Sequence, residues 1–172
     1  MTTSVLEAIY NRRSIREYTC EPVSPEDLKA IAKAGSWAPS GLNNQPWRFV
    51  LISDSTIKLA LSEKTRYAHI IKAAPALIAV YLDKSEMYDT VKDHQAAGAC
   101  IQNMLLAAET LELGAVWLGE ILNKKGEVNR ILDLGDNYDL MAILAIGYPA
   151  HRNQKSQRKD LEYLIIKEIQ EK

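Results

Sequence analysis

The chain has 172 residues, of which 47% are hydrophobic, a size and content that suit one compact domain with a sizeable core. We therefore expect residues 1–172 to form a single domain. The 21 lysines and arginines nearly balance the 22 aspartates and glutamates, which leaves a formal net charge of -1. A near-neutral chain lacks the broad basic surface that nucleic acids require, so no nucleic-acid partner is expected.

The cysteines and the N-terminus predict a cytoplasmic protein. Cys20 and Cys100 lie far apart in the sequence, which suggests reduced thiols and no disulfide framework. Residues 1–13 lack the apolar core of a signal peptide. No segment approaches the roughly eighteen consecutive apolar residues of a membrane span, so no membrane partner is expected.

Helical and strand-like patterns alternate from the start of the chain. Ser4 followed by Glu7 is a capping box that opens a first helix, and the arginine-rich residues 12–16 would close it. The apolar positions of this helix that are available for burial are Leu6, Ile9 and Tyr10. The next elements are predicted as a helix over 24–35, a strand over 48–53, a helix over 55–64 and a strand over 76–82.

The longest helical pattern runs from Asp93 to Leu113. Its apolar residues recur at helical spacing on more than one face, which predicts a central buried helix. Its alanines and Gly98 would let another helix approach closely, either a neighbour in the same chain or the same helix of a second subunit. The remaining elements are predicted as a strand over 115–119, a helix over 124–132 and a strand over 140–147.

Two polar clusters carry the candidate chemistry. Residues 12–16 (RRSIR) concentrate three arginines where a phosphate could dock, although arginines at a helix C-terminus also complement its dipole or form a solvated face. Residues 38–47 (APSGLNNQPW) offer amides that can bond the carbonyls and ring nitrogens of a heterocycle. A plain solvated turn is the alternative for this loop.

Two further motifs follow these clusters in order, WLG at 117–119 and GYPAHRNQKSQRKDL at 147–161. Together the four segments resemble the nitroreductase-like family of flavoproteins over nearly the full chain. The resemblance implies an α+β fold, with a mixed β-sheet sandwiched by helices, and a homodimer with FMN at the subunit interface. The alternation of strands and helices alone would equally suggest a doubly wound sheet, but no GxGxxG or P-loop supports that fold.

The resemblance also implies which residues contact FMN. Those at the phosphate, the ribityl chain and the pyrimidine edge would be Arg12, Arg13, Ser14 and Arg16, joined at the phosphate by Arg158 and Lys159. Those that reach the isoalloxazine from the other subunit would be Pro39, Ser40, Asn43 and Gln45. Main-chain amides of Leu118 and Gly119 would face flavin N5 and O4, and Trp47 would anchor the loop in the core.

The chain departs from the family pattern in two places. Where relatives carry prolines, residues 151–157 read HRNQKSQ, which predicts a more mobile segment. The region 83–92 is short, which suggests an open pocket above the flavin, edged by Met87 and Tyr88. Glu120 would either orient a substrate or remain a solvated acid.

Other chemistries fit the sequence poorly. The three histidines, His69, His94 and His151, lack metal-ligand spacing, so no metal is expected. Asp93 beside His94 imitates an acid-base pair, but adjacent residues of a helix point apart, and we interpret Asp93 as a helix cap.

The hypothesis from sequence is an FMN-dependent oxidoreductase with a small-molecule electron acceptor. NAD(P)H would give hydride to flavin N5, and a nitroaromatic or quinone would then take the electrons in the same pocket by a ping-pong mechanism. Because the flavin carries the chemistry, no catalytic side chain is expected. The alternatives are a dehalogenase, azoline oxidase or flavin-destructase reaction of the same family, a non-catalytic FMN-binding module, and a flavin-free scaffold dimer.

Overall fold

Four strands form one sheet in the computed structural model, which describes residues 4–170. They are β1 (Trp47–Ile52), β2 (Ala76–Asp83), β3 (Gly114–Leu118) and β4 (Tyr138–Gly147), in the order β1-β2-β4-β3. All three strand pairs are antiparallel, and Gly114 lies opposite Gly147. At the edge of β3, Ser14 and Ala115 form an isolated bridge that is parallel.

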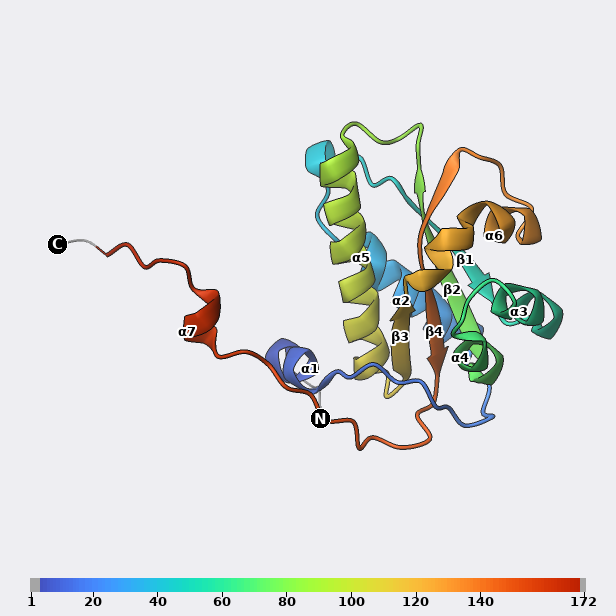
Figure 1. The fold of residues 1–172 in the computed structure, drawn as a ribbon, viewed down its shortest axis with the longest axis horizontal. Helices are drawn as coiled ribbons and strands as arrows, with labels where there is room; N and C mark the ends of the chain where they lie inside the picture. The colour runs from blue at the N-terminus through green and yellow to red at the C-terminus, as the bar shows by residue number, and fades with distance from the viewer. Residues whose placement is uncertain (1–3, 171–172) are drawn as a thin grey trace.

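Helices cover both faces of this sheet (Figure 1). They are α1 (Val5–Asn11), α2 (Pro25–Ser36), η1 (Gly41–Asn43), α3 (Ser55–Ser62), α4 (Ala68–Ala73), α5 (Thr90–Thr110), η2 (Glu120–Lys124), α6 (Lys125–Ile131) and α7 (Leu161–Leu164). Figure 1 shows α2 and α5 on one side of the sheet and α3, α4 and α6 on the other. The predicted α+β fold with helices around a sheet is confirmed, and the doubly wound alternative is wrong because the strands pair antiparallel.

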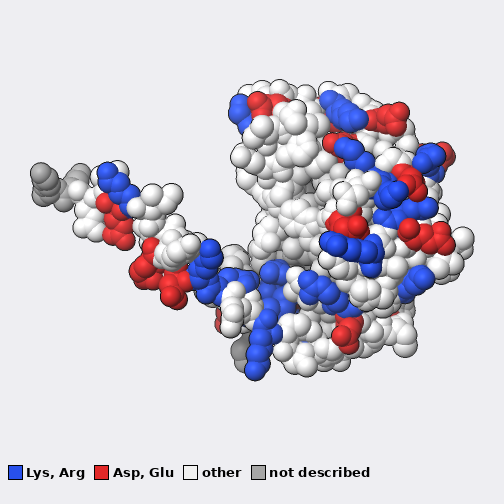
Figure 2. Space-filling view, in the orientation of Figure 1, with Lys and Arg blue, Asp and Glu red and all other residues white. Residues whose placement is uncertain are grey.

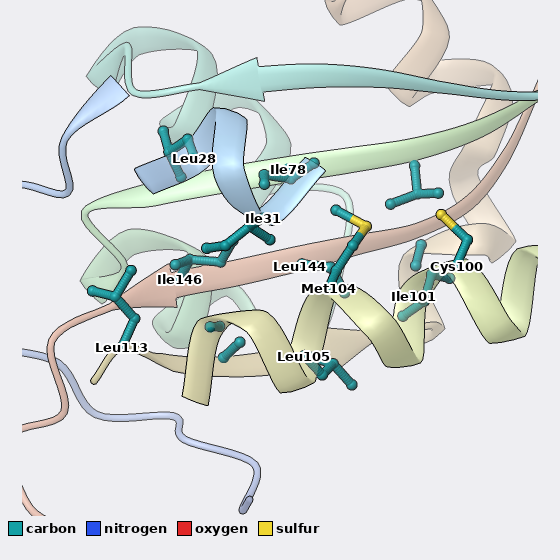
Figure 3. Close-up of a cluster of buried hydrophobic side chains, with 14 of the residues drawn as sticks. Leu28, Ile31, Ile78, Cys100, Ile101, Met104, Leu105, Leu113, Leu144 and Ile146 are labelled. Atoms are coloured by element: carbon teal, nitrogen blue, oxygen red, sulfur yellow. The ribbon is translucent and has the colours of Figure 1, made fainter. Parts of the chain in front are cut away.

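The side chains of β2 point alternately into two separate core layers. Ile78 and Val80 pack in the layer of α2 and α5, whereas Leu77 and Ala79 pack in the layer of α3, α4 and α6. Successive strand residues point to opposite faces, so a strand covered on both sides becomes a continuous apolar run. Figure 3 shows the first layer, in which Met104 of α5 lies among side chains of α2 and the sheet.

The central position predicted for the longest helix is confirmed. Eight residues of α5 are buried, although the helix begins at Thr90, before the predicted start at Asp93. Asp89 is its N-cap and accepts a hydrogen bond from the backbone N–H of Lys92 at 2.9 Å. Within residues 4–170, neither this helix nor any other is long and apolar enough to cross a membrane.

The first helix has its predicted capping box, but most of its apolar side chains are not buried in the single chain. Glu7 N donates to Ser4 Oγ at 3.2 Å, and Ser4 N donates to Glu7 Oε2 at 2.8 Å. The three apolar residues available for burial, Leu6, Ile9 and Tyr10, are exposed. The reason is position: α1 lies outside both core layers, beside the C-terminal part of α5 (Figure 1).

Gly114 and Gly147 leave room for the segment that follows α1. A Cβ added to Gly114 would lie 2.6 Å from Ile15 Cβ, and one added to Gly147 would lie 2.9 Å from Tyr18 Cδ1. Ile15 N also donates to the carbonyl of Ala115 at 3.1 Å. The arginine-bearing segment is therefore fixed closely against the end of the sheet.

Gly114→Ala should lower the free energy of unfolding by about 1–3 kcal/mol, because the new methyl group meets the stiff β-branched side chain of Ile15. Gly126→Ala in α6 is the matched control, since its Cβ would meet nothing within 4 Å. The control should be neutral or stabilising by up to about 1 kcal/mol, because alanine favours a helix over glycine. Urea denaturation measures both, and a fully stable Gly114→Ala protein would contradict the close packing.

Candidate functional site

A basic cavity lies where α1 meets the C-terminal segment. Its volume is about 440 Å³, and its lining comprises Arg12, Arg13, Ser14, Arg16, Gln154, Lys155, Ser156 and Arg158. Figure 2 shows Lys and Arg side chains gathered at this end, near the base of the extended C-terminal segment. The lining contains five cationic side chains and no carboxylate, so it suits a small anion.

Repulsion among these cations favours a bound anion. Loss of solvent is the largest cause that lowers the pKa of Arg12, followed by the positive charges of Arg158 and Arg13, while Glu109 acts in the opposite direction. The Arg13 guanidinium is oriented locally, because its Nη1 donates to the carbonyl of Tyr10 at 2.7 Å. A phosphate group would offset the repulsion and accept several of these donors, so the donor set fits the phosphate of FMN.

The structure separates the two basic residues predicted from the C-terminal segment. Arg158 lines the cavity, and its Nη1 donates to the carbonyl of Gln157 at 3.0 Å. Lys159 is not part of this lining, because its ammonium lies 4.5 Å from the centre of the Tyr163 ring. Of this pair, the structure brings Arg158 to the basic cavity and turns Lys159 away from it.

The amide loop, residues 38–47, has a strained backbone. Leu42, Asn43 and Gln45 have φ angles of 55°, 55° and 48°, in the left-handed region that non-glycine residues rarely adopt. The loop is held from within, because Gln45 N donates to Ser40 Oγ at 3.1 Å. Pro39, Asn43 and Gln45 are exposed, whereas Ser40 is half-buried. Strain of this kind concentrates at ligand sites, where the surroundings hold it in place.

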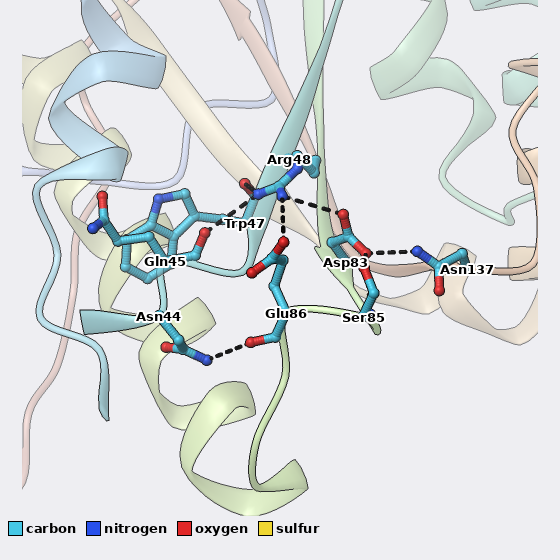
Figure 4. A network of polar contacts seen from close by, with 8 residues as sticks. All are labelled: Asn44, Gln45, Trp47, Arg48, Asp83, Ser85, Glu86 and Asn137. Carbon is cyan, nitrogen blue, oxygen red and sulfur yellow. Dashed lines mark hydrogen bonds and ion pairs between the residues drawn. The ribbon is translucent and has the colours of Figure 1, made fainter. Parts of the chain in front are cut away.

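Asn44 ties this loop to the start of α5, a contact that sequence reasoning missed. Its Nδ2 donates to Asp93 Oδ1 at 2.7 Å and to the carbonyl of Glu86 at 2.9 Å, the second shown in Figure 4. The fully buried Asp93 also accepts from the backbone N–H groups of Tyr88 and Asp89. Burial raises the pKa of Asp93, but the bonds from Asp89, Asn44 and Tyr88 lower it below its ordinary value.

One expectation at this end of α5 needs correction. Asp93 is not the helix cap, because Asp89 holds that position and Asp93 lies one turn later. The Tyr88 ring lies beside Gly41 of the amide loop, where an added side chain would overlap it. An Asn and an Asp that meet across 49 residues have no local sequence pattern, which is why the sequence did not reveal them.

Trp47 anchors the loop in the core, as predicted, with 5% of its surface exposed. Next to it, Arg48 forms an ion pair of 3.2 Å with Asp83 at the end of β2. Asp83 also accepts hydrogen bonds from Ser85 and Asn137, both at 2.6 Å, as Figure 4 shows for Asn137. The bond from Ser85 is the largest cause of a lowered pKa at Asp83. This network fixes the turn that follows β2.

The WLG motif ends the edge strand β3. Leu118 is buried, whereas the side chain of Trp117 is 43% exposed. A Cβ added to Gly119 would approach only the Trp117 indole, at 3.9 Å, so this backbone leaves room for an outside group. Glu120 is not a free solvated acid, because its carboxylate accepts from Thr65 Oγ1 at 2.6 Å, a bond that lowers its pKa.

The amide loop and the basic cavity lie at opposite ends of α5 (Figure 1). Asn44 bonds Asp93 near the start of the helix, while Glu109 near its end bonds Arg152 and lies close to Arg12. Sixteen residues separate Asp93 from Glu109, which corresponds to about 24 Å of helix. The amide loop and the basic cavity are therefore contacted by opposite ends of this helix.

Asp93→Ala should lower the free energy of unfolding by about 3 kcal/mol at neutral pH, because it leaves buried donors without acceptors. The folded-state pKa of Asp93 is depressed, so its contribution is complete above the unfolded-state pKa and is lost as pH falls through the lower folded value. The difference from wild type, measured by urea denaturation, should therefore shrink on acidification. Asp89→Ala removes an N-cap and should cost about 1 kcal/mol; an equal effect of both variants contradicts this account.

Comparison with known proteins identifies the family. Residues 9–66 and 56–148 match the model of the Nitroreductase family. A proposed NADH dehydrogenase/NAD(P)H nitroreductase from Archaeoglobus fulgidus is 35% identical over 147 residues, 84% of each chain. An FMN reductase (NAD(P)H) from Bacillus subtilis is 29% identical over 172 aligned residues, which cover 90% of this chain and 69% of that one. The crystal structure of a proposed nitroreductase from Desulfovibrio desulfuricans in complex with FMN matches with a TM-score of 0.93 and 49% identity, over 99% of this chain and all of the other. This chain therefore belongs to the nitroreductase family, as its motifs predicted.

Proposed function

We propose that this protein is an FMN-dependent oxidoreductase that takes hydride from NAD(P)H and reduces a nitroaromatic or quinone-type acceptor by a ping-pong mechanism. The observation that carries the proposal is the basic cavity, where five cationic side chains and Ser14 surround a space without a carboxylate. Relatives that are named NAD(P)H nitroreductase and FMN reductase, and a neighbour with FMN bound, support both the cofactor and the electron donor.

The residues have distinct roles in this proposal. Arg12, Arg13, Ser14 and Arg158 bind the phosphate and the ribityl chain. Arg16 faces the pyrimidine edge, where its fixed charge stabilises the negative charge that develops on reduction. FMN supplies the hydride chemistry when bound, and the protein contributes binding, orientation and electrostatics.

We place each flavin between two copies of the chain. The basic cavity of one copy would meet the exposed loop residues of the other, because about 24 Å of helix separates these features within one chain. The loop residues that would reach the partner's flavin are Pro39, Ser40, Asn43 and Gln45. Main-chain amides of Leu118 and Gly119 would come from the same copy as the arginines.

Uncovered apolar surface supports this homodimer. Large apolar side chains are exposed on α1 and along the C-terminal segment, at Leu6, Tyr10, Leu161, Tyr163, Ile166 and Ile169. This segment extends away from the body in Figure 1, and Figure 2 shows little charge over α5. A methyl group added to Gly98 would touch nothing within 4 Å, whereas α2 approaches α5 at Gly35. The face of α5 around Gly98, which also borders a cavity of about 300 Å³, is thus open to the second subunit.

Anaerobic mixing with NADH or NADPH separates this enzyme from a non-catalytic FMN-binding module. We expect one of the two nucleotides to bleach the visible flavin band of the FMN-loaded protein, and a later addition of a nitroaromatic or a quinone to restore it. A band that persists in excess NADH and in excess NADPH contradicts the oxidoreductase proposal and favours the module. Colourless protein that takes up no added FMN favours the flavin-free scaffold.

A complementation experiment tests the placement of FMN between two copies. Arg12→Ala and Asn43→Ala should each weaken FMN retention about tenfold or more as homodimers, because a charged or amide contact is lost. Arg130→Ala, a basic residue of α6 outside the cavity, is the control that keeps its flavin. A mixed dimer with one Arg12→Ala copy and one Asn43→Ala copy contains one intact site and should regain half of the bound FMN. Failure to regain flavin would place both residues at the same copy's flavin.

A further inference from the structure

A second cavity, of about 300 Å³, lies beyond the end of β3, between α5, η2 and the first residues of β4. Its apolar walls include Ile101, Trp117, Leu122 and Met141. Three titratable side chains complete it, namely His94, Lys125 and Asp139. An apolar pocket with a few convergent polar groups is the usual form of a small-molecule site.

The three titratable side chains lie close together on one side of this cavity. Lys125 Nζ donates to Asp139 Oδ1 at 2.7 Å, and His94 Nε2 lies 4.0 Å from Asp139 Oδ2. His94 Nδ1 lies 2.5 Å from the carbonyl of Thr90, which can only accept, so Nδ1 carries a proton. Asp139 is nearly buried, at 15% exposure, whereas Lys125 is 57% exposed.

This geometry presents a fixed ammonium group to an incoming ligand. The ammonium of Lys125 has three N–H donors, and the bond to Asp139 uses one of them. The other donors are available to a ligand carboxylate. Across the cavity, the half-exposed indole of Trp117 offers a flat surface for an aromatic ring. The cavity therefore suits an aromatic molecule with an anionic end.

The cavity also lies beside the proposed reactive edge of the flavin. Trp117 immediately precedes Leu118 and Gly119, whose amides are proposed to face N5 and O4, and consecutive Cα atoms are about 3.8 Å apart. A ring held against Trp117 is thus close to the atom that transfers hydride. This part of the argument rests on the proposed function.

We propose that this cavity binds the electron acceptor and that Lys125 selects acceptors with a carboxylate on an aromatic ring. For a nitro-substituted acceptor, the hydride that originates from NAD(P)H and one solvent proton supply two electrons and two protons. One N–O bond breaks, its oxygen leaves as water, and a nitroso group remains. The carboxylate takes no part in this step and serves to hold and orient the ring.

Binding of benzoate, which has no reducible group, tests the cavity without turnover. Calorimetry on the FMN-loaded protein should give a Kd that Lys125→Met raises about tenfold. Asp139→Asn should lower the Kd, because it removes a negative charge from the cavity and releases Lys125 from its ion pair. Lys124→Met is the matched control, since the adjacent Lys124 pairs with Glu127 at 3.1 Å outside this lining, and its Kd should equal that of wild type.

Paired acceptors test the selection and separate it from the proposed function. Wild type should reduce para-nitrobenzoate with a higher kcat/KM than nitrobenzene, and Lys125→Met should lower this ratio about tenfold, whereas Lys124→Met should keep the wild-type ratio. Equal ratios in wild type and Lys125→Met, with benzoate binding unaltered, overturn the inference and leave the oxidoreductase intact. Reduction of neither compound, with benzoate binding still dependent on Lys125, contradicts the proposed function and preserves the cavity as an anion site.

Discussion

The length of one buried helix determines how the candidate site is assembled. α5 has 21 residues, about 31 Å, and packs beside α2 on one face of the sheet. Asp93 near its start holds the amide loop, and Glu109 near its end lies beside the basic cavity. Because a packed helix cannot bend its ends together, the two features remain apart in one chain. A flavin that used both features would have to join two copies, which is the arrangement of the proposed homodimer.

Both halves of the site are unfavourable in the isolated chain, and a ligand relieves each of them. Five cations share the lining of one cavity without a carboxylate, and Leu42 adopts a left-handed backbone that costs about 1–2 kcal/mol. Gly114 of β3 and Gly147 of β4 let the segment that bears the arginines pack closely against the sheet. The buried hydrogen bond between Asn44 and Asp93 holds the amide loop. Binding of a phosphate and of a second copy would then stabilise the folded state by mass action.

Local sequence patterns predicted most helices and strands of this fold, but they did not predict contacts between residues that lie far apart in the sequence. The capping box at Ser4, the apolar run of β2 and the helical period of α5 each depend on neighbours in the sequence, and each is present. The helix α4 and the pair of Asn44 and Asp93 were missed, because a six-residue helix has little period and a pair 49 residues apart has none. The apolar side chains of α1 were identified from the sequence, but three of them are exposed in the part of the chain that the structure describes. For the candidate site, the motifs predicted five residues of the basic cavity but not Gln154, Lys155 and Ser156. Lys159, which was predicted at the phosphate, instead lies against the ring of Tyr163.

Asp139 has opposing effects on an anion in the second cavity. Its negative charge repels a carboxylate, yet its 2.7 Å bond holds Lys125, a flexible side chain that would otherwise lose much rotamer freedom when a ligand binds. A tethered ammonium has already lost part of this freedom, so its remaining donors bind with a smaller entropy loss. The repulsion weakens the binding of every carboxylate to a similar degree. The fixed position of Lys125 favours the carboxylates whose ring can also reach Trp117. The pair thus lowers affinity for anions in general and raises selectivity among them, which suits a site that must release its product after each turnover.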